Sequence, residues 1–145
     1  MTEGEHGFTL IELLIVLTLM AFITIVIFFH FQVMIETYET YQFVHTLRDD
    51  LYTMQLQASV FRHTYLLKVD VSHHEYVIQN MTNHRQYVRK IPAHIHLSIL
   101  PSGEAYTITS NGLPLQYRTF QIQTNDKTYK IRFFLTRGRL EFVEG

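Results

Sequence analysis

The chain has 145 residues, about one domain, and its 12 Lys and Arg residues against 13 Asp and Glu residues give a formal net charge of −1. This balance excludes a globally basic nucleic-acid-binding protein and an acidic solvating tail. With 47% hydrophobic and 17% charged residues, the composition is that of a folded chain. Cysteine is absent, which excludes disulfides, thiolate metal sites and cysteine nucleophiles.

An apolar segment runs from Phe8 to Phe29, and its only polar members are Thr9, Glu12, Thr18 and Thr24. A helix of this length spans about 33 Å, enough to cross a hydrocarbon core of about 30 Å. A buried helix of a soluble protein is disfavoured, because a chain of 145 residues does not easily wrap a helix that is apolar all round. A cleaved signal peptide is disfavoured too, since its apolar region would be about 7–15 residues long. We therefore expect a retained membrane-spanning helix.

Glu12 is the one charged residue of this segment. A carboxylate costs about 2.5–3.5 kcal/mol at the middle of a membrane helix, and less near its end. Two interpretations stay open at this point. Either the side chain reaches the membrane interface from the start of the helix, or it pairs with a cation from outside this segment.

The run Gly7-Phe8-Thr9-Leu10-Ile11-Glu12, followed directly by apolar residues, resembles the class III signal of type IV pilins and pseudopilins. In that family a membrane-embedded prepilin peptidase cuts after the Gly and methylates the new N-terminus. The resemblance implies a leader over residues 1–7, a cut between Gly7 and Phe8, and N-methylation of Phe8. It also implies that Glu12 pairs with the Phe8 amine of an adjacent subunit and sets the register of a helical filament.

The leader departs from the family pattern, because it contains no Lys or Arg. Whether this leader is atypical or the start of translation lies elsewhere is left open by the sequence.

No Gly or Pro occurs between Phe8 and Ile91, so the helix is expected to continue past the membrane. We expect it to run from Thr9 to about His63, with residues 8–29 in the membrane and residues 30–63 outside as an amphipathic helix. The spacing of apolar residues by three and four predicts one buried face. That face is expected to comprise Val44, Leu47, Leu51, Met54, Ala58 and Phe61.

From Tyr65 onward, short β-prone runs alternate with turn residues. We expect an α+β protein in which a β-rich head, residues 64–145, covers the apolar face of the helix with an antiparallel sheet. The resemblance to pilins implies the same fold. The expected strands are Tyr65–Val71, Glu75–Met81, Gln86–Lys90, Ile95–Leu100, Ala105–Thr109, Thr119–Gln123, Thr128–Leu135 and Leu140–Val143.

The medium-length helix, the antiparallel head and the ending Phe134-Leu135-Thr136-Arg137-Gly138-Arg139-Leu140 resemble the ComGD-like minor pilins of Gram-positive competence systems. This resemblance implies a structural subunit of a competence pilus that is needed for DNA binding and uptake. It also implies a single-pass protein of the cell membrane with its head outside, displayed at the cell surface within the pilus. Its partners would be major and minor pilins, the prepilin peptidase and membrane lipid.

Two other functions stay open. Type II secretion pseudopilins share a similar strand–Gly–Arg ending, and the N-terminal signal does not distinguish them from pilus subunits. A single-pass membrane-anchored binding protein is the third hypothesis, and it predicts that the leader survives in the mature chain.

No motif for enzymatic chemistry is found: Gly-x-Ser-x-Gly and Gly-rich phosphate loops are absent, and the neighbouring acids Asp49 and Asp50 point apart on a helix. We therefore expect no enzyme, no cofactor and no small-molecule substrate. Among nine histidines, His94 and His96 would share one face of a strand. A zinc site needs three or four converging ligands, so we expect solvent-facing histidines and no metal site.

Residues 85–139 carry nine bases and two acids, although the whole chain is nearly neutral. We expect a basic patch, with Tyr87 and Tyr129 nearby, that contacts DNA phosphates or a partner. Acids of neighbouring pilins and anionic cell-wall polymer are the alternative partners. The candidate residues are Arg85, Arg89, Lys90, Lys130, Arg132, Arg137 and Arg139.

Overall fold

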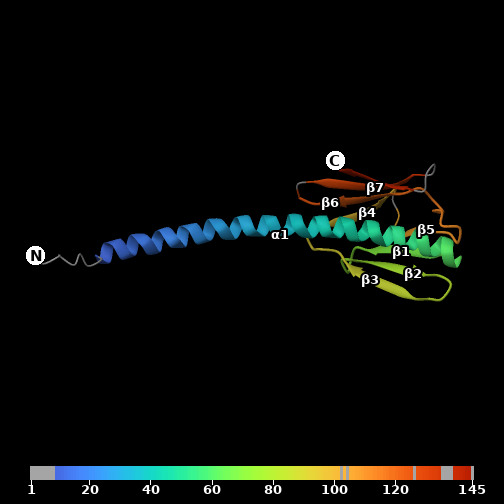
Figure 1. Ribbon diagram of the computed structural model, residues 1–145, viewed down its shortest axis with the longest axis horizontal. Helices are drawn as coiled ribbons and strands as arrows, with labels where there is room; N and C mark the ends of the chain where they lie inside the picture. The colour runs from blue at the N-terminus through green and yellow to red at the C-terminus, as the bar shows by residue number, and fades with distance from the viewer. Residues whose placement is uncertain (1–8, 102, 104, 126, 135–138, 145) are drawn as a thin grey trace, which may run out of the picture. The chain divides into compact units, whose positions relative to one another are not determined.

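The computed structural model describes residues 9–101, 103, 105–125, 127–134 and 139–144. Within these residues the chain forms one helix, α1 (Leu10–Phe61), followed by eight strands in two antiparallel sheets (Figure 1). The chain divides into two compact units, 1–38 and 39–145, with the boundary inside α1. A long N-terminal helix followed by antiparallel strands confirms the expected α+β class.

In the first unit, α1 exposes every side chain that the structure describes, from Leu10 to Tyr38. The helix is long and apolar enough to cross a membrane, with a mean hydropathy of 2.9 over its most apolar 18 residues. Its hydroxyl groups bond to the helix itself: Thr18 Oγ1 donates to the Ile15 carbonyl and Thr24 Oγ1 to the Met20 carbonyl, both at 2.8 Å. Polar groups satisfied within the segment are what a lipid environment requires.

In the second unit, one face of α1 is buried, as the spacing of apolar residues predicts. Five of the six expected residues, Val44, Leu47, Leu51, Met54 and Ala58, are at most 4% exposed.

The prediction for Phe61 is wrong, because its side chain is 61% exposed. The helix ends at this residue, two positions before the expected end, and Arg62 takes a left-handed conformation with φ 56°. The buried face of α1 therefore stops at Ala58, about one turn before the helix ends.

The strands form two sheets where one was expected. The first sheet has the order β3-β2-β1-β5 and the second has the order β4-β6-β7-β8. The single-sheet expectation fails because β5 returns to pair with β1, whereas β4 pairs with β6. The strands are β1 (Tyr65–Asp70), β2 (Glu75–Asn80), β3 (Gln86–Lys90), β4 (His96–Leu100), β5 (Ala105–Ile108), β6 (Thr119–Gln123), β7 (Thr128–Phe134) and β8 (Arg139–Glu144).

Each expected strand is present, and the bounds agree within one residue where the structure describes them; Leu135 lies outside the described residues. Asx turns help to end two strands. Asp70 Oδ1 accepts the N–H groups of Ser72 and His73 after β1, and Asn80 Oδ1 accepts those of Thr82 and Asn83 after β2.

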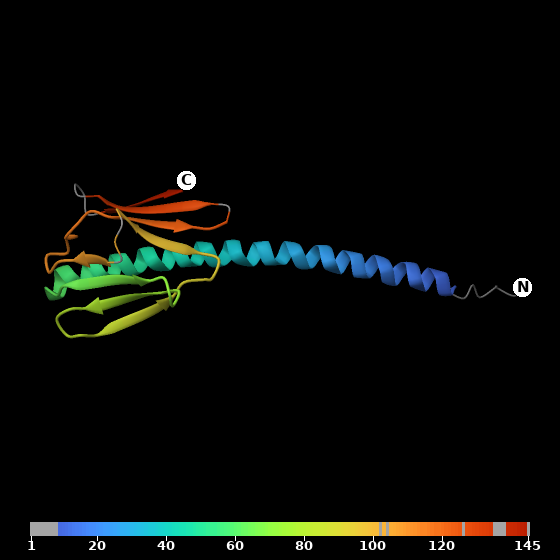
Figure 2. The same ribbon diagram turned by 180° about the vertical axis from the view of Figure 1, so that it is seen from behind.

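An apolar core lies between the second part of α1, residues 39–61, and the two sheets. The strands β1, β2 and β3 lie on one side of this part of the helix, and β4, β6 and β7 lie on the other (Figures 1 and 2). Tyr106 of β5 and Phe120 of β6 join the sheets through an edge-to-face contact with ring centroids 5.0 Å apart. Alternate residues of the strands complete the core, among them Leu67, Tyr76, Ile99, Ile122 and Ile131.

Candidate assembly and binding sites

The predicted cleavage site, Gly7 and Phe8, lies outside the described residues, whereas Glu12 lies within them, in the first turn of α1. Its carboxylate Oε2 accepts hydrogen bonds from the Thr9 backbone N–H and the Thr9 hydroxyl, both at 3.1 Å. In return, the Glu12 N–H donates to Thr9 Oγ1 at 3.4 Å. This reciprocal pair is a capping box, in which the two side chains satisfy backbone donors at the start of the helix.

The capping box was absent from the sequence interpretation, although its signal is present. A Thr followed three residues later by Glu, directly before an apolar run, is the pattern of this motif. Glu12 therefore has a local partner before any neighbouring subunit is considered. The charge of the carboxylate remains uncompensated by this bond, because Thr9 is neutral.

The structure distributes the candidate basic residues over two sheets. Arg85 precedes β3, and Arg89 and Lys90 belong to it; β3 is an edge strand whose five residues are all exposed. Lys130 and Arg132 belong to β7, an inner strand of the other sheet. Arg139 is the first residue of β8, and Arg137 lies outside the described residues. The first three thus lie along one edge strand, with Arg85 at the β2–β3 turn and Lys90 at the other end opposite Glu75, and the pair on β7 forms a separate group.

Arg89 has a structural partner that the sequence did not indicate. Asp50 of α1 accepts hydrogen bonds from Arg89 Nε at 3.1 Å, Arg89 Nη2 at 3.3 Å and the Tyr76 hydroxyl at 2.7 Å. Burial and this bond to Asp50 raise the pKa of Tyr76, so the phenol stays a donor. The bond to Asp50 also raises the pKa of Arg89. The cluster attaches β2 and β3 to the helix. Of the three candidate bases on and before β3, Arg85 and Lys90 do not belong to this cluster.

The two histidines expected to share a strand face are separated. His94 precedes β4, which begins at His96, because a turn occupies residues 93 and 94. The His94 ring contacts α1: its Nε2 lies 3.0 Å from Thr40 Oγ1 and its Nδ1 lies 3.7 Å from Glu39 Oε2. His96 is exposed. No group of three or more potential ligands converges among the described residues.

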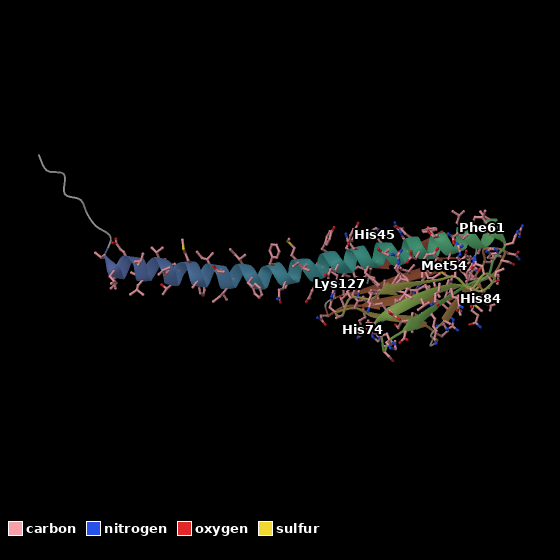
Figure 3. The ribbon with its side chains drawn as sticks, turned by 90° about the horizontal axis from the view of Figure 1, so that it is seen from below. His45, Met54, Phe61, His74, His84 and Lys127 are labelled. Carbon is pink, nitrogen blue, oxygen red and sulfur yellow. The ribbon has the colours of Figure 1, made fainter. Side chains whose placement is uncertain are left out.

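A cavity of about 280 Å³ opens where α1 ends against the β2–β3 hairpin. Its lining includes Phe61 at the end of α1, His63 just after it, Tyr65 of β1 and Asn80 of β2. Arg85, which precedes β3, and Tyr87 of β3 also belong to it. Figure 3 shows Phe61 and His84 at this end of the second unit, and His74 at the opposite end. No sequence pattern indicated this cavity, because its walls come from segments that meet only in the folded chain.

Comparison with known proteins gives a motif and a fold. Residues 4–28 match the model of the prokaryotic N-terminal methylation motif. No curated protein matches the sequence of the chain.

Two solved structures are similar to this one. The minor pseudopilin EpsH from the type 2 secretion system of Vibrio cholerae superposes with a TM-score of 0.61 at 12% identity, covering 73% of this chain and 97% of EpsH. The type IV minor pilin FimU of Pseudomonas aeruginosa superposes with a TM-score of 0.60 at 18% identity, covering 74% of this chain and 90% of FimU. The chain therefore has the N-terminal methylation motif and the fold of the type IV pilin and pseudopilin superfamily.

Proposed function

We propose that the chain is a minor pilin of a competence type IV pilus, a structural subunit that serves DNA uptake. The observation that carries this proposal is the exposed apolar surface of the helix from Leu10 to Tyr38. Its described side chains are all exposed, its threonine hydroxyls at positions 18, 24 and 37 bond to their own helix, and its one acid up to Ile35 is Glu12 in the first turn. Such a surface has to be covered, by lipid before assembly and by neighbouring stems in a filament.

The proposed maturation begins with cleavage between Gly7 and Phe8 and methylation of the Phe8 amine. The new N-terminus is a cation, and Glu12 of an adjacent subunit is the anion that it meets in a medium of low dielectric constant. An unpaired buried charge costs several kcal/mol, so this pairing selects one axial register between subunits. The contact is heterologous and does not close, which builds a helical filament.

The first test is the mass of the mature N-terminus, measured on the chain from its native membrane with and without the prepilin peptidase. We expect a chain that begins at Phe8, carries one added methyl group, and depends on the peptidase. A retained leader would contradict the proposal and favour a membrane-anchored binding protein.

The second test separates the two roles of Glu12. Glu12→Gln keeps an oxygen that can accept the bonds of the capping box, whereas Glu12→Ala removes it. Neither variant has the charge. We expect both variants to be cleaved and both to be excluded from filaments isolated by shearing. Normal incorporation of Glu12→Gln alone would mean that helix capping, and not charge pairing, is what assembly needs.

A type II secretion pseudopilin is the second candidate, and the likeness to EpsH favours it. The competence assignment is supported by the resemblance of the C-terminal ending and by the excess of bases in residues 85–139. Deletion of the chain in its native host distinguishes the two candidates. We expect loss of transformation with normal protein secretion, and the reverse result would favour the pseudopilin.

A further inference from the structure

We call the cavity at the end of α1 the end cavity. In its wall, the amide of Asn80 determines which neighbouring side chains can donate a hydrogen bond. Asn80 Oδ1 accepts the backbone N–H groups of Thr82 at 2.9 Å and Asn83 at 3.2 Å. The other end of the amide, Nδ2, is therefore the donor that lies 3.1 Å from His63 Nδ1 and 3.0 Å from Tyr65 Oη. A side-chain amide has two N–H groups, so Asn80 donates to both.

This arrangement leaves the His63 and Tyr65 side chains each with a hydrogen to donate. Because His63 Nδ1 accepts a hydrogen bond, the neutral ring carries its proton on Nε2. Because the Tyr65 oxygen accepts a bond from Asn80, its own O–H remains to be donated. Arg85 adds a guanidinium, and no Asp or Glu belongs to the lining. Three lining groups, His63, Tyr65 and Arg85, can therefore donate, and the lining contains no carboxylate, which suits a ligand that is rich in acceptors and negatively charged.

The mouth of the end cavity also presents aromatic rings. Phe61 is 61% exposed and Tyr87 is 60% exposed, so both rings are accessible to a ligand. The Phe61 ring lies 6.2 Å from the His63 ring at an angle of 34°. Exposed rings beside a guanidinium form the surface on which unpaired bases stack while their phosphates are held. A phosphate polymer without bases would leave these rings without a partner.

The charge around the end cavity agrees with an anionic ligand. The sequence contains no Asp or Glu from Leu51 to Val69 or from Tyr76 to Gly103, and the described residues 105–125 contain none either. Figure 3 places His84, which directly precedes Arg85, at the same end as Phe61. The acids Asp70 and Glu75 belong to the opposite end of their strands, next to the β1–β2 turn.

We propose that the end cavity binds unpaired nucleotides of a nucleic-acid strand. A base stacks on Phe61 and Tyr87, and the adjoining phosphate accepts hydrogen bonds from Arg85 and the inner donors. A cavity of about 280 Å³ lies just under the size of typical small-ligand sites, about 300–1,000 Å³, which suits one nucleotide at a time. The proposal names the ligand of the head and rests on the proposed DNA-uptake function for its biological setting.

The test measures the fluorescence anisotropy of a labelled twelve-nucleotide oligothymidylate with the full chain in detergent micelles. We expect tighter binding of this strand than of a blunt duplex of equal length, because paired bases are not free to stack on the rings. Tyr87→Ala should weaken binding about 5- to 150-fold, the range found for loss of one stacked base, and Arg85→Gln should weaken it through loss of a charge-assisted bond to the phosphate. Both side chains are exposed, so thermal unfolding should be unchanged.

Matched controls change the same properties elsewhere. Lys127→Gln removes one positive charge at an exposed position at the opposite end, and Tyr41→Ala removes a tyrosine that is 63% exposed. We expect less than a twofold change for both. Equal weakening by the controls, equal binding of the duplex, or equal competition by a glycerol phosphate polymer would overturn the proposal.

Failure of this proposal is distinguishable from failure of the proposed function. If deletion of the chain abolishes transformation while the end-cavity variants bind the strand normally, the cavity proposal is wrong and the pilin function stands. If deletion leaves transformation intact while binding depends on Arg85 and Tyr87, the uptake function is wrong and the binding site stands.

Discussion

From Leu10 to Tyr38, helix α1 exposes every described side chain, whereas from Thr40 to Ala58 one face of the same helix is buried under two sheets. The backbone is helical throughout, so the difference is in what covers the apolar surface. The second part obtains its cover from residues of the same chain. The first part obtains none within the described residues, so a large apolar area stays exposed to solvent.

The acids of the two parts show the same difference. Glu12 accepts its hydrogen bonds from Thr9, three residues away. Asp50 accepts from Tyr76 and Arg89, which are 26 and 39 residues away. The hydrogen bonds of Glu12 therefore need only the first turn of the helix, whereas those of Asp50 need the folded β2 and β3 strands.

The largest expected effect comes from removing a side chain in the buried part. Leu47 is fully buried, so Leu47→Ala should lower the free energy of unfolding of the second unit by about 2–5 kcal/mol. The same change at Leu17, which is 55% exposed, should leave it unaltered. Denaturant unfolding in detergent, followed by near-ultraviolet circular dichroism of the tyrosines, measures both. An equal loss at Leu17 would show that the two parts unfold as one unit.

The next effect tests the distant partners of the helix. Asp50→Asn removes the charge that holds Arg89 and weakens the acceptor of the buried Tyr76 hydroxyl, so we expect a loss of about 1.5–3 kcal/mol. The neighbouring Asp49 has a side chain that is 67% exposed and pairs only locally with Arg48 among the described contacts. Asp49→Asn should change stability by less than about 0.5 kcal/mol. Equal losses for the two variants would remove the structural role given to Asp50.

A smaller effect tests where the boundary between the two parts lies. Thr40 is buried and its hydroxyl bonds to His94, whereas the exposed Thr37 hydroxyl bonds to the Val33 carbonyl of its own helix. Thr40→Val should cost about 1 kcal/mol, since it leaves a half-buried imidazole without this partner. Thr37→Val should be neutral, because bonding back to the helix adds little stability. The same unfolding measurement applies, and a neutral Thr40→Val would move the boundary toward Phe43.

The smallest expected effect concerns the exposed pair Asp70 and His73, which lies outside α1, and its contribution to stability. Asp70 accepts a hydrogen bond from His73 Nδ1 at 2.9 Å, which raises the pKa of His73 above its ordinary 6.5. The same bond lowers the pKa of Asp70. The contribution of His73 to the stability of the fold is complete at pH values below its unfolded pKa. It disappears as the pH rises through the raised pKa of the folded state. The contribution of Asp70 is lost as pH falls through its lowered folded pKa.

Nuclear magnetic resonance titration of the His73 ring protons checks this expectation. We expect a midpoint above 6.5 that returns toward that value in Asp70→Asn. An unchanged midpoint in the variant would show that Asp70 is not the cause.

The sequence by itself determined the elements of this protein: the unbroken helix, its exposed apolar part, most of its buried face and all eight strands. These follow from periods of 3.6 and 2 and from turn residues, which act over a few neighbours. The Thr9–Glu12 capping box is equally local and was readable in principle. Only the tertiary structure decided which strands pair, and therefore that there are two sheets and that the bases are divided between them. Several strand orders satisfy the same alternation of buried and exposed residues, so the contacts of Asp50 and the walls of the end cavity exist only once one order has formed.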